Sequence, residues 1–251
     1  MKLSVIILTL NEEKVIKDCL ESVKWVDEIV VVDSGSTDRT KEIAKKYTEK
    51  IFTHKLTSFA EQREFGADKT EGDWILYLDA DERISRDLRL EIEKEIEKNK
   101  YPAFKMPRQN YFYGKKIRFG GYWPDYVTRL FKKKNLLGWQ GKIHESARFK
   151  GKLGALNSPL IHLSHRNVSD GFAKSLVWTK MEAELFCQAS HPKVTALRVL
   201  KVGFWEFCYR YIKKQGFRDG FIGFMEAMIQ AWNRLMVYIQ LWELQEKELR
   251  L

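Results

Sequence analysis

Cysteine is scarce in this 251-residue sequence. Only Cys19, Cys187 and Cys208 are present, and none of them has the Cys-x-x-Cys spacing of metal and redox sites. An odd number of cysteines without such spacing gives no sign of a disulfide framework and favours a reducing compartment. We interpret the three cysteines as core residues and expect a cytoplasmic protein.

Long apolar runs are also missing. The most apolar stretch, residues 221–242, is interrupted by Glu226 and Arg234, so it lacks the roughly 18–20 uninterrupted apolar residues of a spanning helix. Residues 1–10 have the form of a short strand rather than of a secretory signal. The eleven aromatic residues within 197–243 alternate with charges, which is typical either of a helical layer packed on the core or of helices lying in a membrane interface. Peripheral attachment to the inner face of the cytoplasmic membrane is therefore an option.

Acidic residues are nearly absent from residues 101–152. Thirteen Lys or Arg residues stand there against only Asp125 and Glu145, so the segment carries a net charge of +11 while the other 199 residues are nearly neutral. A charge this concentrated attracts phosphates, whether on a membrane surface, a sugar donor, a lipid or a nucleic acid. Lipid and donor phosphates satisfy it as well as a nucleic acid does, and we expect no nucleic-acid partner.

Strands and helices alternate over the first hundred residues. The apolar runs suited to buried strands are Leu3–Thr9, Glu28–Val32, Ile51–His54 and Trp74–Leu78. Between them apolar residues recur at helical spacing, with Asn11 expected to cap the first helix, and a charged helix follows at Asp87–Lys98. This alternation predicts an α/β fold with a mostly parallel sheet.

Composition changes twice after this alternating half. Residues 101–166 are rich in aromatic, glycine and basic residues and contain short alternating runs typical of hairpin strands, whereas the remainder has helical spacing. We therefore divide the chain into an α/β half at 1–100, a basic β region of the same domain at 101–166 and a helical region at 167–251.

Acidic side chains follow two of the predicted strands. Asp33 ends the run IVVVD, and the triplet Asp79-Ala80-Asp81 follows the run WILYL. Because the carboxyl ends of parallel strands form the edge where α/β sheets bind ligands, we expect these acids to share one crevice. Carboxylates placed there can hold Mg²⁺ or Mn²⁺ together with diphosphate oxygens. The alternative is that they only cap the turns that follow the strands.

Four segments of the first half have a recognisable order and spacing: SVIILTLNEE, VVDSGSTD, EQREFGA and YLDADERIS. They resemble the nucleotide-sugar domain of the family 2 glycosyltransferases. The later segments WPDYVTRLF, GKIHES, LIHLSHRN and IKKQGFRDGFIGF resemble the subgroup that contains the lipopolysaccharide core glucosyltransferases, so the resemblance covers nearly the whole chain. It implies a GT-A type fold: a Rossmann-like, mostly parallel sheet with a small mixed β region on the acceptor side and a C-terminal helical appendage.

The resemblance also assigns donor-side roles by position. The residues that would bind the nucleotide sugar are Thr9, Asn11 and Glu12 around the nucleoside, Asp33 and Ser34 at the nucleobase, Arg63 near the base or diphosphate, and Asp79 and Ala80 near the ribose or sugar. Asp81 would be the direct ligand of Mg²⁺ or Mn²⁺. His162, at the end of another predicted strand, would be a second metal ligand, with an ordinary structural histidine as the alternative.

Enzymes of this type invert the anomeric centre, which requires a carboxylate to take a proton from the acceptor hydroxyl. Glu145 is the expected base, because it is one of two acids in the basic segment, where surrounding cations would keep it ionised. Asp125 is the rival base, and an ordinary surface ion pair is the plain alternative for Glu145. Arg129 would bind phosphates of the acceptor, since its planar guanidinium suits them.

The expected function is the transfer of a hexose from a nucleotide-diphosphate sugar, with UDP-glucose the first expectation, to a lipid-linked acceptor such as an inner-core lipopolysaccharide sugar. Two alternatives stay open. Transfer to a polyprenyl phosphate would need no base, because that acceptor is already ionised. A non-catalytic protein that binds anionic membrane or nucleic acid through residues 101–152 would leave the strand-end acids unexplained.

Overall fold

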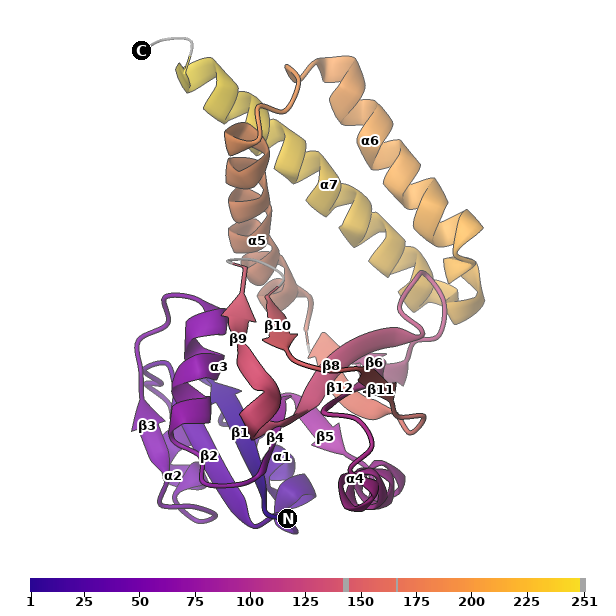
Figure 1. The fold of residues 1–251 in the computed structure, drawn as a ribbon. Helices are drawn as coiled ribbons and strands as arrows, with labels where there is room; N and C mark the ends of the chain where they lie inside the picture. Colours follow the sequence, from indigo (N-terminus) through magenta and orange to yellow (C-terminus); the bar gives the residue numbers. More distant parts are fainter. Residues whose placement is uncertain (142–144, 166, 249–251) are drawn as a thin grey trace. The chain divides into compact units, whose positions relative to one another are not determined.

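The chain forms two compact units (Figure 1). The computed structural model describes residues 1–141, 145–165 and 167–248. Unit 1 comprises residues 1–109 and 125–162, and unit 2 comprises residues 110–124 and 163–251. The basic segment anticipated at 101–166 therefore contributes to both units.

Unit 1 is built on a mixed sheet with the strand order β3-β2-β1-β4-β8-β6-β12-β5. Its strands are β1 (Leu3–Thr9), β2 (Glu28–Asp33), β3 (Ile51–Thr53), β4 (Trp74–Asp79), β5 (Glu82–Ile84), β6 (Ala103–Phe112), β8 (Asp125–Lys132), β11 (Leu153–Ala155) and β12 (Leu160–His165). The first four strands of that order are parallel, and they are the four that the apolar runs predict. They confirm the predicted parallel arrangement of the first half.

The mixed part of the sheet continues from β4. Strand β8 runs antiparallel to β4 and to β6, and β12 runs antiparallel to β5. A separate hairpin is formed by β9 (Leu136–Gln140) and β10 (Ser146–Phe149). The short runs in the basic segment are thus strands, as their alternation predicts.

The described residues of unit 1 form four α-helices: α1 (Ile16–Val23), α2 (Thr40–Ala44), α3 (Phe59–Asp68) and α4 (Arg86–Lys98). Ser58 and Ser85 cap α3 and α4, each accepting a hydrogen bond at 3.2 Å from the backbone N–H three residues later. The prediction that Asn11 caps the first helix is wrong: α1 begins at Ile16, and Asn11 lies in the preceding loop with φ of 54°.

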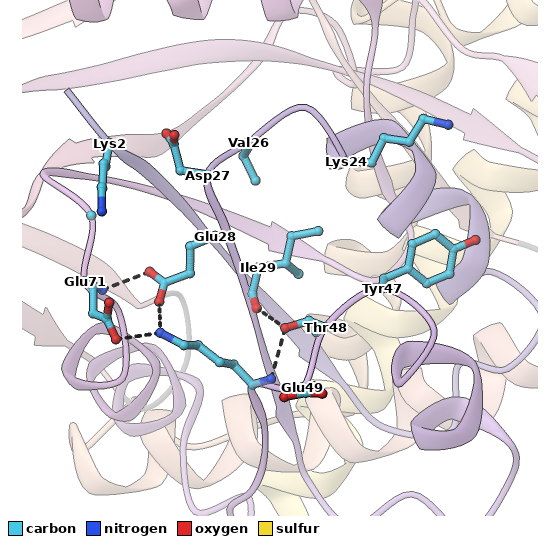
Figure 2. Close-up of a pocket in the computed structure, with 12 residues that line it drawn as sticks. Lys2, Lys24, Val26, Asp27, Glu28, Ile29, Tyr47, Thr48, Glu49 and Glu71 are labelled. Atoms are coloured by element: carbon cyan, nitrogen blue, oxygen red, sulfur yellow. Dashed lines mark hydrogen bonds and ion pairs between the residues drawn. The ribbon is translucent and has the colours of Figure 1, made fainter.

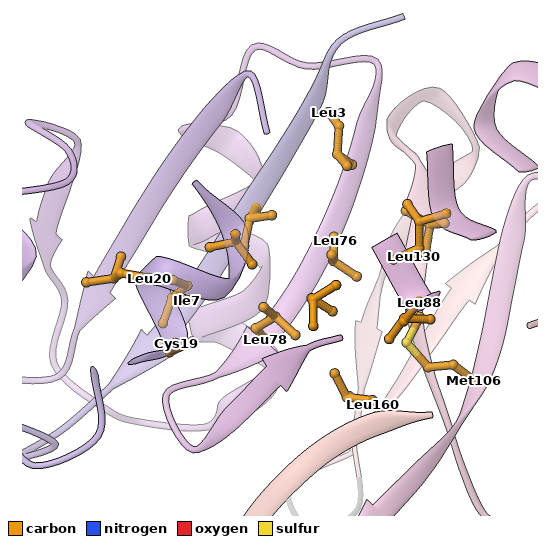
Figure 3. Packing of buried hydrophobic residues seen from close by; sticks show 14 of the residues in the cluster. Leu3, Ile7, Cys19, Leu20, Leu76, Leu78, Leu88, Met106, Leu130 and Leu160 are labelled. Atoms are coloured by element: carbon orange, nitrogen blue, oxygen red, sulfur yellow. The ribbon is translucent and has the colours of Figure 1, made fainter. Parts of the chain in front are cut away.

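Side-chain alternation along the buried strands separates two apolar layers. Leu3, Val5 and Ile7 of β1 pack with the apolar faces of α1, α2 and α4, and Figure 3 shows part of this layer around Leu76 and Leu78. The intervening residues of β1 point to the opposite face, where α3 and the β9–β10 hairpin cover the sheet. Because both faces of the parallel strands are covered, β1 and β4 are apolar along most of their length. The packing on both faces holds the carboxyl ends of these strands in place.

Unit 2 is mainly helical, as predicted for the C-terminal region. Its helices are α5 (Val168–Gln188), α6 (Ala196–Cys208) and α7 (Gly220–Glu248), with a π-helical turn at Tyr209–Lys213, a 3₁₀ turn at Gly216–Asp219 and the short strand β7 (Lys115–Lys116). The long helix α7 packs against both α5 and α6 (Figure 1). Within the described ranges, none of the helices combines the length and the apolar character that crossing a bilayer requires.

Candidate functional site

The strand-end acids lie at one edge of the sheet, as the sequence predicts. In the register of the parallel strands, Thr9 of β1 pairs with Asp33 of β2, and Leu8 pairs with Asp79 of β4. Two strand spacings separate the two acids, so their Cα atoms are about 10 Å apart. Backbone register alone therefore brings the ends of β1, β2 and β4 together.

Asp33 organises the turn that follows β2. Its buried carboxylate accepts hydrogen bonds from the backbone N–H of Gly35 at 3.1 Å and of Ser36 at 2.8 Å. Gly35 has φ of 102°, a left-handed conformation that glycine adopts without strain. The capping alternative thus accounts for Asp33 in this structure, and its contact with a nucleobase stays a prediction.

The loops after β1 and β2 are tied to each other. The Asn11 N–H donates to Ser36 Oγ at 2.8 Å, and Asn11 Oδ1 accepts from the Thr37 N–H at 2.8 Å. The Glu12 N–H donates to Thr40 Oγ1 at 2.8 Å, and the Ser34 N–H donates to the Thr9 carbonyl at 2.9 Å. These bonds hold the predicted nucleoside-binding residues in one wall of the site.

Thr9 carries an unsatisfied polar atom in this wall. The residue is 5% exposed, and its buried Oγ1 has no hydrogen-bond partner among the described residues. A buried hydroxyl without a partner is costly, so a ligand or water that reached it would gain a hydrogen bond. This feature fits the place that the sequence gives Thr9 beside a polar ligand.

Two arginines from different elements hold Asp79. Arg63 of α3 lies 3.2 Å from Asp79 Oδ1, and Arg129 of β8 pairs with Asp79 Oδ2. Burial raises the pKa of the Asp79 carboxyl, but the charges of Arg129 and Arg63 outweigh burial and hold that pKa well below its ordinary value of 3.8. Asp79 is therefore a carboxylate whose two oxygens are both engaged by protein cations.

Glu82, which sequence reasoning missed, completes this cluster from inside the protein. Its side chain is fully buried, lies 2.8 Å from Arg129 and 3.6 Å from Arg108, and accepts the N–H of Asp79 at 3.0 Å. A buried carboxylate requires such partners. Arg129 thus bridges Asp79 and Glu82, and its predicted role with acceptor phosphates stays a prediction.

Arg83, also missed, fixes the backbone around the triplet. Its guanidinium donates to the carbonyls of Ala80 at 2.8 Å and Glu82 at 2.7 Å, and to the carbonyl of Val15 at 2.5 Å. The turn that carries Asp81 is therefore attached to the segment preceding α1. The sequence signal for both residues is that the charged pair Glu82-Arg83 directly follows the Asp79-Ala80-Asp81 triplet. In a solvated turn these side chains would be exposed, whereas both are buried here.

Asp81 and His162 come together although they are 81 residues apart. His162 of β12 pairs with Glu82 of β5 in the sheet, and its Nε2 lies 3.6 Å from Asp81 Oδ2. Of the residues that the structure describes, no group of three or more His, Cys, Asp and Glu could hold a metal by itself. Mg²⁺ and Mn²⁺ bind through one or two protein ligands when phosphate oxygens supply the rest, so this pair fits such a cation in a diphosphate complex.

The two candidate bases have different partners. Glu145 precedes β10 and pairs with Arg63, whose Nε and Nη2 lie 3.3 Å and 3.2 Å from its Oε1. Asp125, at the start of β8, is paired with Arg108 at 2.6 Å and 2.8 Å. His144, which precedes Glu145 in the sequence, lies outside the described residues. Arg63 thus connects Glu145 to Asp79.

A pocket of about 440 Å³ opens beside this cluster. Its lining includes Arg63, Asp79, Arg129, Trp139 and Glu145. Arg63 is fixed there by the rings of Trp139 and of Tyr77, whose centroids lie 5.0 Å and 5.6 Å from its guanidinium carbon. The volume of this pocket and the polar side chains that converge on it are typical of a site for a small ligand.

A larger pocket of about 670 Å³ lies at the opposite edge of the sheet. Lys50 pairs there with Glu28 at 2.5 Å and with Glu71 at 2.7 Å. Figure 2 shows Glu28 and Glu71 in this pocket. Glu28 begins β2, whereas Asp33 ends it, so this pocket lies at the amino ends of the parallel strands. Ligands of open α/β sheets bind at the carboxyl ends, which favours the smaller pocket as the functional one.

Comparison with known proteins decides the family. Residues 4–150 match the sequence profile described as "Glycosyl transferase family 2". The chain is a family 2 glycosyltransferase. It is therefore an enzyme, and the alternative of a non-catalytic binding protein is set aside.

The similarity extends beyond the matched region of this glycosyltransferase. It is 30% identical to an uncharacterized glycosyltransferase of Rickettsia bellii, over 97% of this chain and 87% of that protein. It is 27% identical to the lipopolysaccharide core biosynthesis glycosyltransferase LpsC of Rhizobium meliloti, over 92% of this chain and 88% of that protein.

A solved structure gives the same fold. The structure of S. aureus TarS residues 1–349 in complex with UDP aligns with a TM-score of 0.50 and 15% identity, over 100% of this glycosyltransferase and 92% of that chain. The likeness confirms the predicted GT-A type fold.

Asp79→Asn tests the charge network of the glycosyltransferase. A carboxyl whose folded-state pKa is lowered stabilises the fold fully above about pH 5, and this stability is lost as the pH falls through 3.8 toward the folded-state pKa. We expect the substitution to lower the free energy of unfolding by about 1–3 kcal/mol at pH 7 and by progressively less at lower pH.

Urea unfolding of the native protein and the variant between pH 3 and pH 7 measures this difference. Asp18→Asn, at an exposed position of α1, is the matched control and should change the free energy of unfolding at pH 7 by under about 0.5 kcal/mol. A difference for Asp79→Asn that stays constant or grows toward low pH would contradict the assignment.

Proposed function

We propose that this glycosyltransferase moves a hexose, with inversion, from a nucleotide-diphosphate sugar to a hydroxyl of a lipid-linked saccharide, with UDP-glucose as the donor. The observation that carries the proposal is a pocket lined by two acids that share Arg63, Asp79 and Glu145. Asp81 follows Asp79 by two residues in the chain and lies beside His162. The UDP bound to TarS and the name of LpsC support the donor nucleotide and the lipopolysaccharide acceptor.

The donor would lie against the ends of β1, β2 and β4. Thr9 Oγ1, which has no hydrogen-bond partner among the described residues, would form a hydrogen bond with the nucleoside. The hydrogen-bonded loops at Asn11, Glu12 and Ser34 would form the surrounding wall. Asp33 would accept from the base. The Arg63 guanidinium, held by two aromatic rings, would present positive charge to the diphosphate without having to reorganise.

Asp81 and His162 would hold Mg²⁺ or Mn²⁺, which when bound neutralises charge on the departing diphosphate. Asp79 is the weaker ligand candidate, because Arg63 and Arg129 already engage both of its oxygens. Its place would instead be beside the ribose or sugar, where an ionised and fixed carboxylate accepts hydroxyl hydrogen bonds. Ala80 contributes the small side chain between these two acids, 3% exposed.

Glu145 would act on the acceptor. As the acceptor oxygen forms its bond to the anomeric carbon, the hydroxyl proton passes to the Glu145 carboxylate and the bond between that carbon and the diphosphate oxygen breaks. Displacement from the face opposite the leaving group inverts the centre. Arg63 lies within hydrogen-bond distance of Glu145, so it would orient the carboxylate in the absence of acceptor.

A lipid-linked acceptor implies work at a membrane surface. The net charge of +11 over residues 101–152 would attract the anionic inner face of the cytoplasmic membrane and the phosphates of a lipopolysaccharide core. Arg129 would not be the first residue to contact the acceptor, because its side chain is 7% exposed and is paired with Asp79 and Glu82. The exposed lysines of the segment would meet the acceptor phosphates instead.

Thermal unfolding with UDP, GDP and ADP, each with and without Mn²⁺, tests the donor site. A ligand at about a hundred times its dissociation constant stabilises a protein by roughly 2.7 kcal/mol, which raises the midpoint of a chain this size by several degrees. We expect a shift that needs both UDP and Mn²⁺, that disappears in Asp81→Ala and that persists in the control Asp18→Ala. Absence of a shift with every nucleotide would overturn the proposed function.

Glu145→Gln tests the acceptor chemistry. A general base contributes about 10²–10⁴-fold, so we expect turnover to fall by that factor while stabilisation by UDP and Mn²⁺ is retained. Asp125→Asn is the matched control and should keep most of the turnover. Unchanged turnover in Glu145→Gln would instead indicate an acceptor that is already ionised, such as a polyprenyl phosphate, and a larger loss in Asp125→Asn would make Asp125 the base.

A further inference from the structure

Helix α6 exposes large apolar side chains that no described residue covers. Leu197, Leu200 and Phe204 follow one another at helical spacing and are 77%, 67% and 71% exposed. Trp205 and Ile212 extend this surface and are 64% and 62% exposed. These five residues are called the α6 stripe below. A contiguous apolar surface of this kind marks an interaction site.

The apolar surface continues past the end of α6. Phe217 in the 3₁₀ turn and Phe221 in the first turn of α7 are 51% and 76% exposed. The opposite side of α6 is already used: Gly203 packs against Leu235 of α7, and Phe207 lies in edge contact with Phe224 at 6.0 Å between ring centroids. The α6 stripe is therefore a second face of the helix, distinct from the one that holds unit 2 together.

The charges around the α6 stripe are positive. Residues 196–220 contain six Lys or Arg and two acids. Both acids are engaged within unit 2, since Glu206 pairs with Arg210 at 2.6 Å and Asp219 accepts the N–H of Phe119 at 2.8 Å. The exposed positive charges beside the stripe are those of Lys201, Lys213, Lys214 and Arg218.

We propose that the α6 stripe lies in the interface of an anionic phospholipid bilayer. Exposed aromatic and aliphatic side chains flanked by lysines are the features of a helix that lies in the plane of a membrane surface. Lys201, beside the stripe, can extend its ammonium group to the phosphates while its methylenes stay among the apolar groups. The inference rests on the proposed function, because it names the surface that would bring the enzyme to a lipid-linked acceptor.

Charge argues for a membrane rather than a second copy of the chain. In a twofold dimer the same patch would face itself, which would place the positive charges of Lys201, Lys213 and Lys214 against the same group of positive charges on the second copy. Like charges so placed cost affinity, whereas phosphate headgroups satisfy them.

Sedimentation with vesicles tests the proposal. The native protein should bind vesicles of phosphatidylglycerol and phosphatidylcholine, bind vesicles of phosphatidylcholine alone more weakly, and lose binding as salt is raised. The double variant Phe204→Glu, Trp205→Glu should bind the anionic vesicles at least tenfold more weakly. Leu90→Glu, at an exposed apolar position of α4 in unit 1, is the control and should bind within twofold of the native protein. Helical circular dichroism and the thermal midpoint establish that each variant is folded.

A second variant examines the charges separately: Lys213→Glu, Lys214→Glu should weaken binding to anionic vesicles and reduce its salt dependence. Equal vesicle binding by the native protein and the Phe204→Glu, Trp205→Glu variant overturns the proposal. So does a dimer that this variant dissociates in the absence of vesicle binding, which would make the stripe a self-association face. Stabilisation by UDP and Mn²⁺ is measured on the same samples, so a failed donor site and a failed membrane surface give different results.

Discussion

The site depends on one ionic arrangement, in which Arg129 lies between Asp79 and Glu82. Glu82 is fully buried, and a buried carboxylate that loses its partner costs about 3–5 kcal/mol. The same guanidinium joins the end of β4 to β8, and Arg63 extends the connection from Asp79 to Glu145. Asp79 and Glu82 therefore cannot be separated from the arginines that balance them.

This arrangement divides the roles of neighbouring acids. Asp79 is neutralised by two arginines, while Asp81, two residues later, faces His162. Arg83 holds the turn between them by donating to the Ala80 carbonyl. Two carboxylates close in sequence thus acquire different environments, which is the basis for the different roles that we propose for them. The rigid parallel strands underneath keep that difference in place.

The sequence was sufficient to predict the parallel strands, because each is a continuous apolar run. It was also sufficient to predict that the acids following these strands lie at one edge of the sheet, because the carboxyl ends of parallel strands share that edge. It was insufficient for the partners of those acids. The sequence predicts an acceptor role for Arg129 because a planar guanidinium suits phosphates. The pairing of Arg129 with Glu82, 47 residues away, depends on the register of β8, which the sequence pattern does not reveal. Asp33 likewise accepts hydrogen bonds from its own turn. Those bonds depend on the conformation of the loop, which the sequence pattern does not specify.

The most direct measurement is a crystal structure of the native enzyme with UDP and Mn²⁺, with the cation located by its anomalous scattering. We expect a manganese ion bonded to Asp81 and close to His162, a diphosphate beside Arg63, and a nucleoside against Thr9 at the carboxyl edge of the sheet. A nucleotide in the pocket at the amino ends of the strands, around Glu28 and Lys50, or a cation away from Asp81, would contradict the proposed site.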